Sequence, residues 1–280
     1  MQIFREIKPL RAFLVEKWRA GQKPGFVPTM GALHQGHLTL IATAKANHPF
    51  TVCSVFVNPT QFNNAEDFAR YPRNLERDVE LLEKAGCDVL FCPDETEMHS
   101  GGQYLKFDFG HMDKVMEGKF RPGHFSGVAQ VVSKLFHIVE PDTAYFGQKD
   151  WQQFVIIRTL VNELKFNVKL QAVETVREPD GLAMSSRNER LSEGQRKEAT
   201  VLSRSLKNAR KQLLQGKSVE DVKKNVLDTF NQSEAVQLEY FEMVNAENLT
   251  PIKAVADADR PILCIAAYVG GVRLIDNMFV

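Results

Sequence analysis

The sequence predicts an α/β protein with a doubly wound, Rossmann-like parallel sheet and a smaller C-terminal α+β domain. Strand-like and helix-like segments alternate over the first two-thirds of the chain, as they do in open parallel sheets. Residues 50–57 form an apolar run, which is typical of a central parallel strand. From about residue 192 the pattern changes to charged amphipathic helices, followed by apolar runs around Gly270-Gly271.

The elements of the larger domain follow in chain order. Residues 4–19 place apolar side chains at helical spacing and predict an amphipathic first helix. Short apolar runs then alternate with longer periodic segments, and Gly86 ends one of the predicted helices. The predicted strands are residues 25–28, 50–57, 88–92, 143–146 and 168–173, and the further helices are residues 37–47, 74–85, 127–139 and 151–163. We expect this domain to cover residues 1–176.

A second domain is expected over residues 177–280. Residues 192–213 and 218–231 carry helical periodicity with many charges, and residues 236–244 alternate like a half-buried strand. The two apolar runs around Gly270-Gly271 predict a β-hairpin. Since no low-complexity linker separates the domains, we expect a short hinge at about residues 176–180.

Composition limits the classes of function. The chain has 280 residues, of which 44% are hydrophobic and 25% charged, as in ordinary soluble globular proteins. Lys+Arg and Asp+Glu both number 35, so no overall field attracts a polyanion and we expect no nucleic-acid partner. The N-terminus lacks a signal-peptide pattern, and no run approaches the ~20 apolar residues of a membrane helix. We therefore expect no membrane association and a cytoplasmic location.

The first candidate site is the segment PTMGALHQGH at residues 28–37. It follows a predicted strand and opens a predicted helix, where helix N–H groups can bind phosphate. Gly31 and Gly36 permit close backbone approach, and His34 and His37 share one face of a helical turn. Two imidazoles there could stabilise charge on a leaving pyrophosphate. The alternative is a pair of surface histidines at a helix start, which the strand–glycine–helix context disfavours.

Two further polar groups follow predicted strands. Gln61 comes after the apolar run at residues 50–57, so we expect it at the carboxyl edge of the sheet. Gly147-Gln148-Lys149-Asp150 lies between a strand and a helix at the same edge. Lys149 offers a point charge for phosphate, and Asp150 can cap the helix and accept a hydrogen bond from a ribose hydroxyl. The alternatives are a turn-capping amide at Gln61 and a simple capped turn at residues 147–150.

These segments together resemble one enzyme family. HxGH is the signature of the nucleotidyltransferase superfamily that includes class I aminoacyl-tRNA synthetases, and PTMGALHQGHLTLI resembles the pantothenate synthetase family specifically. The other resembling segments are FVNPTQF at residues 56–62, Glu66-Asp67, Tyr71-Pro72-Arg73, RPGHF at residues 121–125, FGQKD at residues 146–150 and DGLAMSSRN at residues 180–188. The resemblance extends over about residues 26–190 and adds little in the C-terminal hundred residues.

The resemblance implies an ATP-dependent ligase. Such an enzyme condenses (R)-pantoate with β-alanine through a pantoyl adenylate, releasing AMP and pyrophosphate, as a step of coenzyme A biosynthesis. ATP would be a substrate accompanied by Mg²⁺, which keeps waters and is held largely by phosphates. No protein ligand of the metal is assigned from the sequence. The resemblance also implies a homodimer.

Residue by residue, the resemblance assigns His37 as the catalytic acid, His34 as a phosphate contact and Lys149 as a third catalytic residue. Gln61 and Gln153 would bind pantoate. The implied ATP-binding residues are Met30, Gly31, Ala32, Leu33, His34, Gln35, Gly36, His37, Gly147, Gln148, Lys149, Asp150, Val176, Met184, Ser185, Ser186 and Arg187. Residues 184–187 resemble a mobile loop over the triphosphate, and Val176 would contact adenine through its backbone.

Two other readings remain at this point. Another nucleotidyl-transfer enzyme of the superfamily, such as a cytidylyltransferase or a synthetase fragment, would lack the roles proposed for Gln61 and Gln153. A nucleotide-sensing module without activity would be expected to have lost His34, His37 or Lys149, all of which are present.

Overall fold

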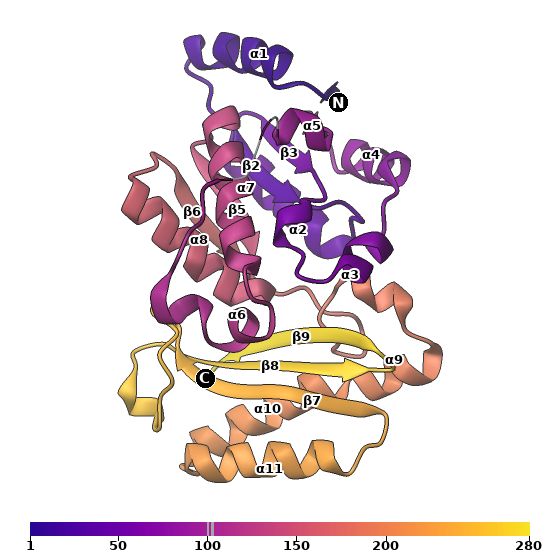
Figure 1. Ribbon diagram of the computed structural model, residues 1–280, viewed down its shortest axis with the longest axis vertical. Coiled ribbons are helices and arrows are strands. Elements are labelled where there is room, and N and C mark those ends of the chain that lie inside the picture. Colours follow the sequence, from indigo (N-terminus) through magenta and orange to yellow (C-terminus); the bar gives the residue numbers. More distant parts are fainter. Residues whose placement is uncertain (100, 102–103) are drawn as a thin grey trace.

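Two sheets organise the molecule, and the computed structural model describes residues 1–99, 101 and 104–280. The larger, six-stranded sheet is parallel and carries helices on both faces. The smaller, three-stranded sheet is antiparallel and packs helices against one face. Figure 1 shows the larger sheet above and the smaller sheet, in orange and yellow, below. The predicted fold class is therefore confirmed.

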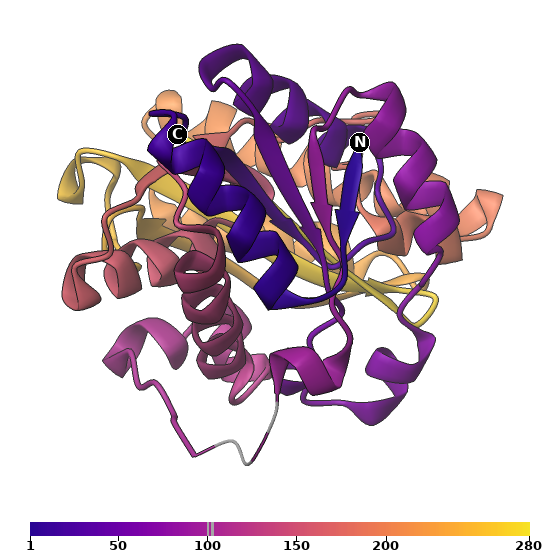
Figure 2. The same cartoon turned by 90° about the horizontal axis from the view of Figure 1, so that it is seen from above.

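The larger sheet has the strand order β1-β4-β3-β2-β5-β6. Its strands are β1 (Gln2–Phe4), β2 (Gly25–Thr29), β3 (Thr51–Val55), β4 (Val89–Phe91), β5 (Thr143–Gly147) and β6 (Lys169–Val173). From β2 the chain builds outward to β3 and β4, and it then returns to add β5 on the other side of β2. Figure 2 shows these strands fanned by their twist, with β1 at one edge. Ligands bind at the point where strand order reverses, which here lies between β2 and β5.

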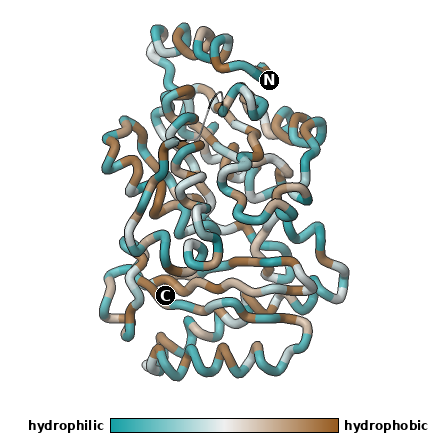
Figure 3. Tube along the Cα trace, viewed as in Figure 1, coloured by the Kyte–Doolittle hydropathy of each residue, from teal (hydrophilic) through white to brown (hydrophobic). Residues whose placement is uncertain are grey.

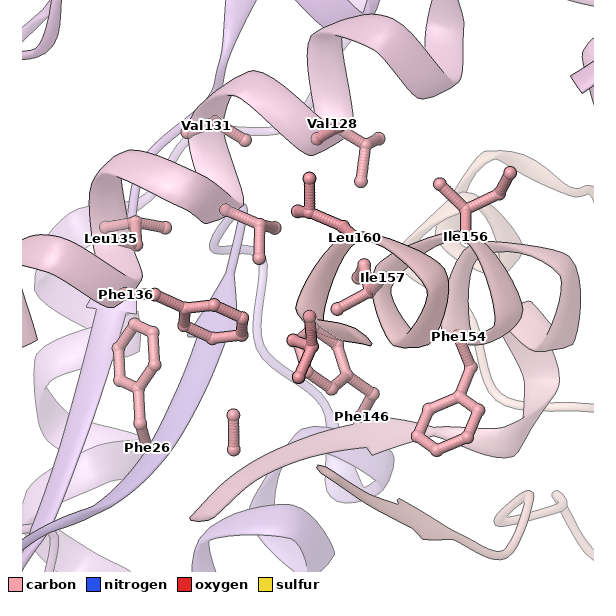
Figure 4. Packing of buried hydrophobic residues seen from close by; sticks show 14 of the residues in the cluster. Phe26, Val128, Val131, Leu135, Phe136, Phe146, Phe154, Ile156, Ile157 and Leu160 are labelled. Atoms are coloured by element: carbon pink, nitrogen blue, oxygen red, sulfur yellow. The ribbon is translucent and has the colours of Figure 1, made fainter. Parts of the chain in front are cut away.

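Helices cover both faces because side chains alternate along each strand. The helices of this part are α1 (Ile7–Arg19), α2 (Gln35–Asn47), α3 (Ala65–Arg70), α4 (Leu75–Lys84), α5 (Glu95–Met98), α6 (Met116–Phe120), α7 (His124–Val139) and α8 (Trp151–Leu164). Phe26 of β2 joins a core with α1, α7 and α8, where it lies near Phe136 and Leu135 (Figure 4). The next residue, Val27, packs on the opposite face with α2 and α4.

Two predicted helices were wrong in their extent. The helix expected over residues 4–19 begins at Ile7, and residues 2–4 instead form the edge strand β1, with Gln2 opposite Val89. Three residues are too short a run to show strand periodicity, and pairing with β4 decides their conformation. The helix expected over residues 192–213 is interrupted at Thr200, whose N–H bonds to the carbonyl of Lys197 in a 3₁₀-type turn.

The smaller sheet has the order β7-β8-β9, with β7 (Val236–Asn245), β8 (Pro261–Val269) and β9 (Val272–Phe279). Gly270 and Gly271, with φ of 54° and 80°, form the tight turn of the predicted hairpin. The short helix α9 (Glu193–Ala199) is followed by α10 (Val201–Leu214) and α11 (Val219–Asn231), and all three contribute buried residues to the core on this sheet. Figure 3 shows α11 alternating between hydrophilic and hydrophobic residues, as a helix packed on one side does.

Strand β9 ties the smaller sheet to the larger part. The Asn277 side-chain amide donates to the carbonyls of Gln148 and Lys149, at 2.8 and 2.7 Å, in the turn that follows β5. Asp276, which is 4% exposed, accepts two hydrogen bonds from Arg177 in the connecting segment. The connection at the predicted hinge is therefore held by buried ionic contacts, while the division into domains at residues 176 and 177 stays a prediction.

All four cysteine side chains are buried, where they pack as small apolar residues. None of the helices in the described part of the chain is long and apolar enough to cross a membrane.

We predict that Arg177→Met lowers the free energy of unfolding by about 3–5 kcal/mol, because it leaves the buried Asp276 carboxylate without its partner. Urea unfolding measures this difference. Arg196→Met is the matched control, since Arg196 bridges two partly exposed carboxylates and should contribute at most about 1 kcal/mol. Equal effects of the two substitutions would contradict the assignment.

Candidate active site

A cavity of about 210 Å³ opens between the carboxyl ends of β2 and β5. One wall is polar and the other apolar. The polar residues include His34, His37, Gln61, Lys149, Asp150, Gln153, Glu174, Ser185, Ser186 and Arg187, and Met30 lies beside them. The apolar wall is formed by Phe56, Val128, Val131, Val132, Leu135 and Phe146. The cavity therefore lies where the strand order predicts a ligand, and it joins charged groups to a hydrophobic surface.

Asp78 of α4 holds the turn that leads from β2 into α2. Its carboxylate accepts hydrogen bonds from the backbone N–H groups of Ala32, at 3.0 Å, and Leu33, at 2.7 Å. The turn needs positive φ at Gly31 (79°) and Ala32 (50°). A Cβ at Gly31 would lie only 2.8 Å from Asp78 Oδ2, so glycine is required there on two counts. Burial raises the pKa of Asp78, and the two N–H donors limit the rise.

His34 and His37 form a reciprocal cap at the start of α2. The N–H of Gly36 donates to His34 Nδ1 at 3.1 Å, and the N–H of His34 donates to His37 Nδ1 at 3.3 Å. Because each Nδ1 accepts, the proton of each neutral ring is on Nε2, the nitrogen on the opposite side of the ring. The ring centroids are 4.1 Å apart, so the predicted shared face is confirmed.

The two imidazoles are neutral at physiological pH. Burial, followed by the charge of Lys149, lowers the pKa of His34 to about 4. Burial lowers the pKa of His37 to about 3, with further contributions from His34 and Lys149. The site therefore presents two Nε2–H donors without placing two more positive charges beside Lys149.

Lys149 enters the cavity from the opposite side, on the turn after β5. The side chain is mostly buried, and its Nζ lies 3.9 Å from Asp150 Oδ1, too far for a strong ion pair. Asp150 stands at the N-cap position of α8, but its side chain makes no capping hydrogen bond. The expected capping role of Asp150 is therefore wrong, and its carboxylate faces the cavity instead.

Gln61 is held in place by its neighbours. It ends the 3₁₀ turn η1 (Pro59–Gln61) after β3, and its carbonyl oxygen accepts from Nδ1 of the buried His124 at 2.8 Å. Its side-chain Oε1 accepts from Asn58 Nδ2 at 3.3 Å, and its Nε2 lies 2.7 Å from Met30 Sδ. The amide thus bonds to side chains and lines the cavity, which argues against the turn-capping alternative.

The segment RPGHFSG at residues 121–127 clamps this turn from α7. At Gly127 an added Cβ would meet the carbonyl oxygen of Thr60 at 2.3 Å, so helix and turn are in backbone contact. Burial lowers the pKa of His124 to about 3, which keeps its Nε2 available to accept from Arg121 Nη1 at 3.3 Å. The sequence had shown this motif without indicating its role.

The loop at residues 184–187 closes the far side of the cavity. Ser185 caps the 3₁₀ turn η4 (Ser186–Arg190), accepting from the N–H of Arg187. Arg187 Nη2 lies 2.9 Å from Asp67 Oδ2 of α3, which joins the loop to the larger part of the molecule. Two further ion pairs make the same connection, Arg190 with Asp67 at 3.7 Å and Arg77 with Glu189 at 3.2 Å.

Most of the expected site residues line the cavity, and some do not. Gly31, Ala32 and Leu33 form the turn behind it, Gln35 is exposed on α2, and Gln148 is bound through its carbonyl to Asn277. The sequence analysis did not identify the apolar cavity residues on α7, because their helical spacing is typical of a buried core helix. Tyr71, which also lines the cavity, lay in a resembling segment but carried no assignment.

A second cavity of about 250 Å³ adjoins the first and shares Lys149, Asp150, Ser185 and Arg187 with it. Arg121, Arg190 and Arg273 add positive charge. Arg273 is neutralised by Glu117 and Glu239, whereas Arg121 lies 3.9 Å from Glu117 and burial lowers its pKa. The Arg121 guanidinium is therefore incompletely compensated, as a group awaiting an anion would be.

Protein side chains alone do not build a metal site in the part of the chain that the structure describes. Among those residues, no group of three or more His, Cys, Asp or Glu side chains is placed to hold an ion.

Comparison with known proteins gives a consistent result. A family model described as pantoate-beta-alanine ligase matches residues 2–279. The pantothenate synthetase of Cytophaga hutchinsonii is 50% identical over 275 residues, which cover 98% of this chain and 97% of the relative. That of Carboxydothermus hydrogenoformans is 46% identical over 280 residues, covering 99% and 98%.

Solved structures agree with these matches. Pantothenate synthetase from Thermus thermophilus superimposes with a TM-score of 0.93 at 43% identity, covering 99% of each chain. The pantoate-beta-alanine ligase from Francisella tularensis, complexed with beta-gamma ATP and beta-alanine, gives a TM-score of 0.78 at 34% identity, covering 99% of this chain and 97% of that one.

We predict that neither His34 nor His37 titrates near pH 6.5, and that both carry the proton on Nε2 between pH 5 and 8. Nitrogen-15 NMR of the imidazoles measures both properties. Because the unfolded chain takes up these protons near 6.5 and the folded chain only near 4 and 3, stability should fall as pH falls through that window. An Nδ1–H tautomer or a midpoint above 6 would contradict the geometry.

We predict that Asp78→Asn lowers the free energy of unfolding by about 1.5–3 kcal/mol, since one carboxylate that serves two N–H donors becomes an amide with a single acceptor oxygen. Thermal and urea unfolding measure this. Asp142→Asn is the control, because the Asp142 carboxylate contacts exposed Lys169, at 3.7 Å, and the neighbouring Thr143 hydroxyl, and accepts no backbone N–H among the described residues. A loss no larger than that of the control would show that Asp78 does not hold the turn.

Proposed function

The chain belongs to the pantoate–β-alanine ligase family, and on that premise we propose that the cavity between β2 and β5 converts pantoate to an acyl adenylate before β-alanine attacks. The overall activity is the ATP-using synthesis of pantothenate. A carboxylate is a poor acyl donor because its leaving group is oxide. Joining it to AMP in a mixed anhydride supplies a good leaving group.

The arrangement of His34, His37 and Lys149 carries this proposal. Two neutral imidazoles with Nε2–H toward one cavity, beside a lysine, suit a polyphosphate on which negative charge develops as pyrophosphate leaves. The resemblance implies that His37 is the catalytic acid. Because its Nδ1 accepts the N–H of His34, we propose that it acts through its Nε2–H, which donates a hydrogen bond to the leaving pyrophosphate as charge develops there.

The acid substrate would lie between Gln61 and the apolar wall. Pantoate combines a carboxylate and two hydroxyls with two methyl groups on one carbon. The amides of Gln61 and Gln153 match the polar groups, and Val128, Val131 and Leu135 match the methyl groups. The carboxylate would then attack the α-phosphorus in line, with its position set by these contacts.

The adenosine would extend toward Val176 and Gly147, with Asp150 in reach of the ribose hydroxyls. Ser185, Ser186 and Arg187 lie on the opposite side, where hydroxyls and a guanidinium can bind phosphate oxygens. We propose that this loop closes over ATP and excludes water from the adenylate.

The adjoining cavity suits the second substrate. Incompletely compensated Arg121, with Arg187 nearby, offers positive charge to the β-alanine carboxylate. The amine nitrogen would then form a bond to the acyl carbon, the bond from that carbon to the AMP oxygen would break, and a proton would leave the ammonium. This step needs no covalent enzyme intermediate.

The donor set also fits Mg²⁺ bound mostly by phosphate. Asp150 and Glu174 are the carboxylates on the cavity wall, and one or two carboxylates are what a nucleotide-bound Mg²⁺ uses. The ion would neutralise part of the polyphosphate charge. We further propose a homodimer and a cytoplasmic location, as the resemblance and the composition imply.

We predict that Lys149→Met reduces the pantoate-dependent release of pyrophosphate by about 10²- to 10³-fold, because it removes a donor that acts on the developing charge. The release is measured in a single turnover with ATP, Mg²⁺ and pantoate, without β-alanine. Lys45→Met, which removes a lysine that donates to the Gly86 carbonyl far from the cavity, should react at the normal rate.

The same measurement tests the order of the steps. Pyrophosphate that appears only after β-alanine is added would rule out an adenylate formed in advance. An unchanged rate in Lys149→Met would remove this residue from the catalytic group.

A further inference from the structure

We propose that Lys134, which lies outside the cavity, acts together with the Gly127 carbonyl to orient the Gln61 amide through a directed chain of hydrogen bonds. In this way it contributes to the choice of groups that the cavity accepts on the acid substrate. The inference rests on the role proposed above for Gln61 in binding pantoate. It adds a positioning residue that touches neither substrate nor ATP.

The chain of contacts passes through two intermediates. Lys134 on α7 places its Nζ 2.6 Å from the carbonyl oxygen of Met98 and 3.0 Å from His99 Nδ1. His99, just after α5, places its Nε2 3.0 Å from Asn58 Oδ1. Asn58, which is 1% exposed, places its Nδ2 3.3 Å from Gln61 Oε1. The side chains of Lys134 on α7, His99 after α5, and Asn58 and Gln61 at the turn η1 thus form one continuous path.

The path has a direction because an ammonium group donates and cannot accept. His99 Nδ1 must therefore accept from Lys134, and the ring proton is on Nε2, which donates to Asn58 Oδ1. The Asn58 amide then presents its NH₂ to Gln61 Oε1. It follows that Gln61 turns its own NH₂ away from Asn58, toward Met30 and the cavity.

Two further features agree with this polarity. The backbone carbonyl of Gly127 can only accept, and it lies 3.2 Å from Asn58 Nδ2, so it favours the same orientation of that amide and acts together with Lys134. Burial and the charge of Lys134 lower the pKa of His99, which favours the neutral ring, in which one nitrogen accepts.

The chemical consequence concerns the face that Gln61 shows to the acid. Its NH₂ group offers donors to carboxylate and hydroxyl oxygens, which are acceptors. A rotated amide would instead place a carbonyl oxygen against those oxygens and repel them. Lys134 would therefore favour hydroxy acids over analogues with an amine or amide N–H at that position.

A purely structural role for Lys134 is the alternative, since its contact with the Met98 carbonyl also joins α5 to α7. Two substitutions separate the roles. Lys134→Arg keeps a side chain that only donates. Lys134→Gln can still donate to Met98, but its amide can either donate to or accept from His99, so the tautomer is no longer imposed.

The test is steady-state kinetics for all three substrates, with nitrogen-15 NMR of His99. We expect Lys134→Gln and Lys134→Met to raise the KM for pantoate by about 3- to 10-fold, the value of one net hydrogen bond, and to leave the KM for ATP unchanged. Lys134→Arg should restore normal values, and Lys45→Met should have no effect. His99 should carry its proton on Nε2 in the unmodified protein and as a mixture of tautomers in Lys134→Gln.

Distinct results would overturn the proposal. An Nδ1–H tautomer of His99 in the unmodified protein breaks the chain, whatever the kinetics. Equal changes in the KM values for pantoate, β-alanine and ATP would assign Lys134 a structural role. A separate result would contradict the proposed binding of pantoate by Gln61: in that case Gln61→Glu would leave the KM for pantoate unchanged.

Discussion

The whole site depends on the pair of hydrogen bonds that Asp78 accepts from the backbone of Ala32 and Leu33. A turn with two successive residues at positive φ is costly for a non-glycine residue such as Ala32, and a buried carboxylate offsets that cost only while both N–H groups bind it. Once the turn is held, His34 becomes the cap of α2 and the backbone sets both tautomers. The tautomers of His34 and His37 therefore depend on the contact of Asp78 with the backbone of the preceding turn.

The other side of the site is held from the smaller sheet. Asn277 of β9 binds the carbonyls of Gln148 and Lys149, which belong to the peptide groups before and after the Lys149 Cα, and Arg177 binds the neighbouring Asp276. Lys149 therefore depends on a strand more than a hundred residues further along the chain. The cavity at the strand-order reversal of the larger sheet is therefore bounded in part by contacts from the smaller sheet. Arg121 of the larger part and Arg273 of β9 line the adjoining cavity together.

The sequence predicted most of this fold because its strands and helices have strong, regular patterns. The hairpin at Gly270-Gly271 and the apolar run over residues 50–57, which contains β3, were visible from their patterns, and the paired histidines were visible from their spacing within a strand–glycine–helix context. Edge strand β1 and the break at Thr200 were not, since pairing and local turn geometry decide them. Asp78 had no visible role because its partners lie 45 and 46 residues away. Val128 and Val131 of the apolar wall also belong to the hydrophobic core, so their helical spacing indicates only core packing.

The central claim is that the pantoate carboxylate attacks the α-phosphorus of ATP while His34, His37 and Lys149 bind the departing pyrophosphate. The most direct measurement is a reaction with pantoate labelled by oxygen-18 in its carboxylate, followed by mass spectrometry of the products. The account predicts one labelled oxygen in the phosphate of AMP and the other in the amide of pantothenate. Label in pyrophosphate or inorganic phosphate, or AMP without label, would contradict it.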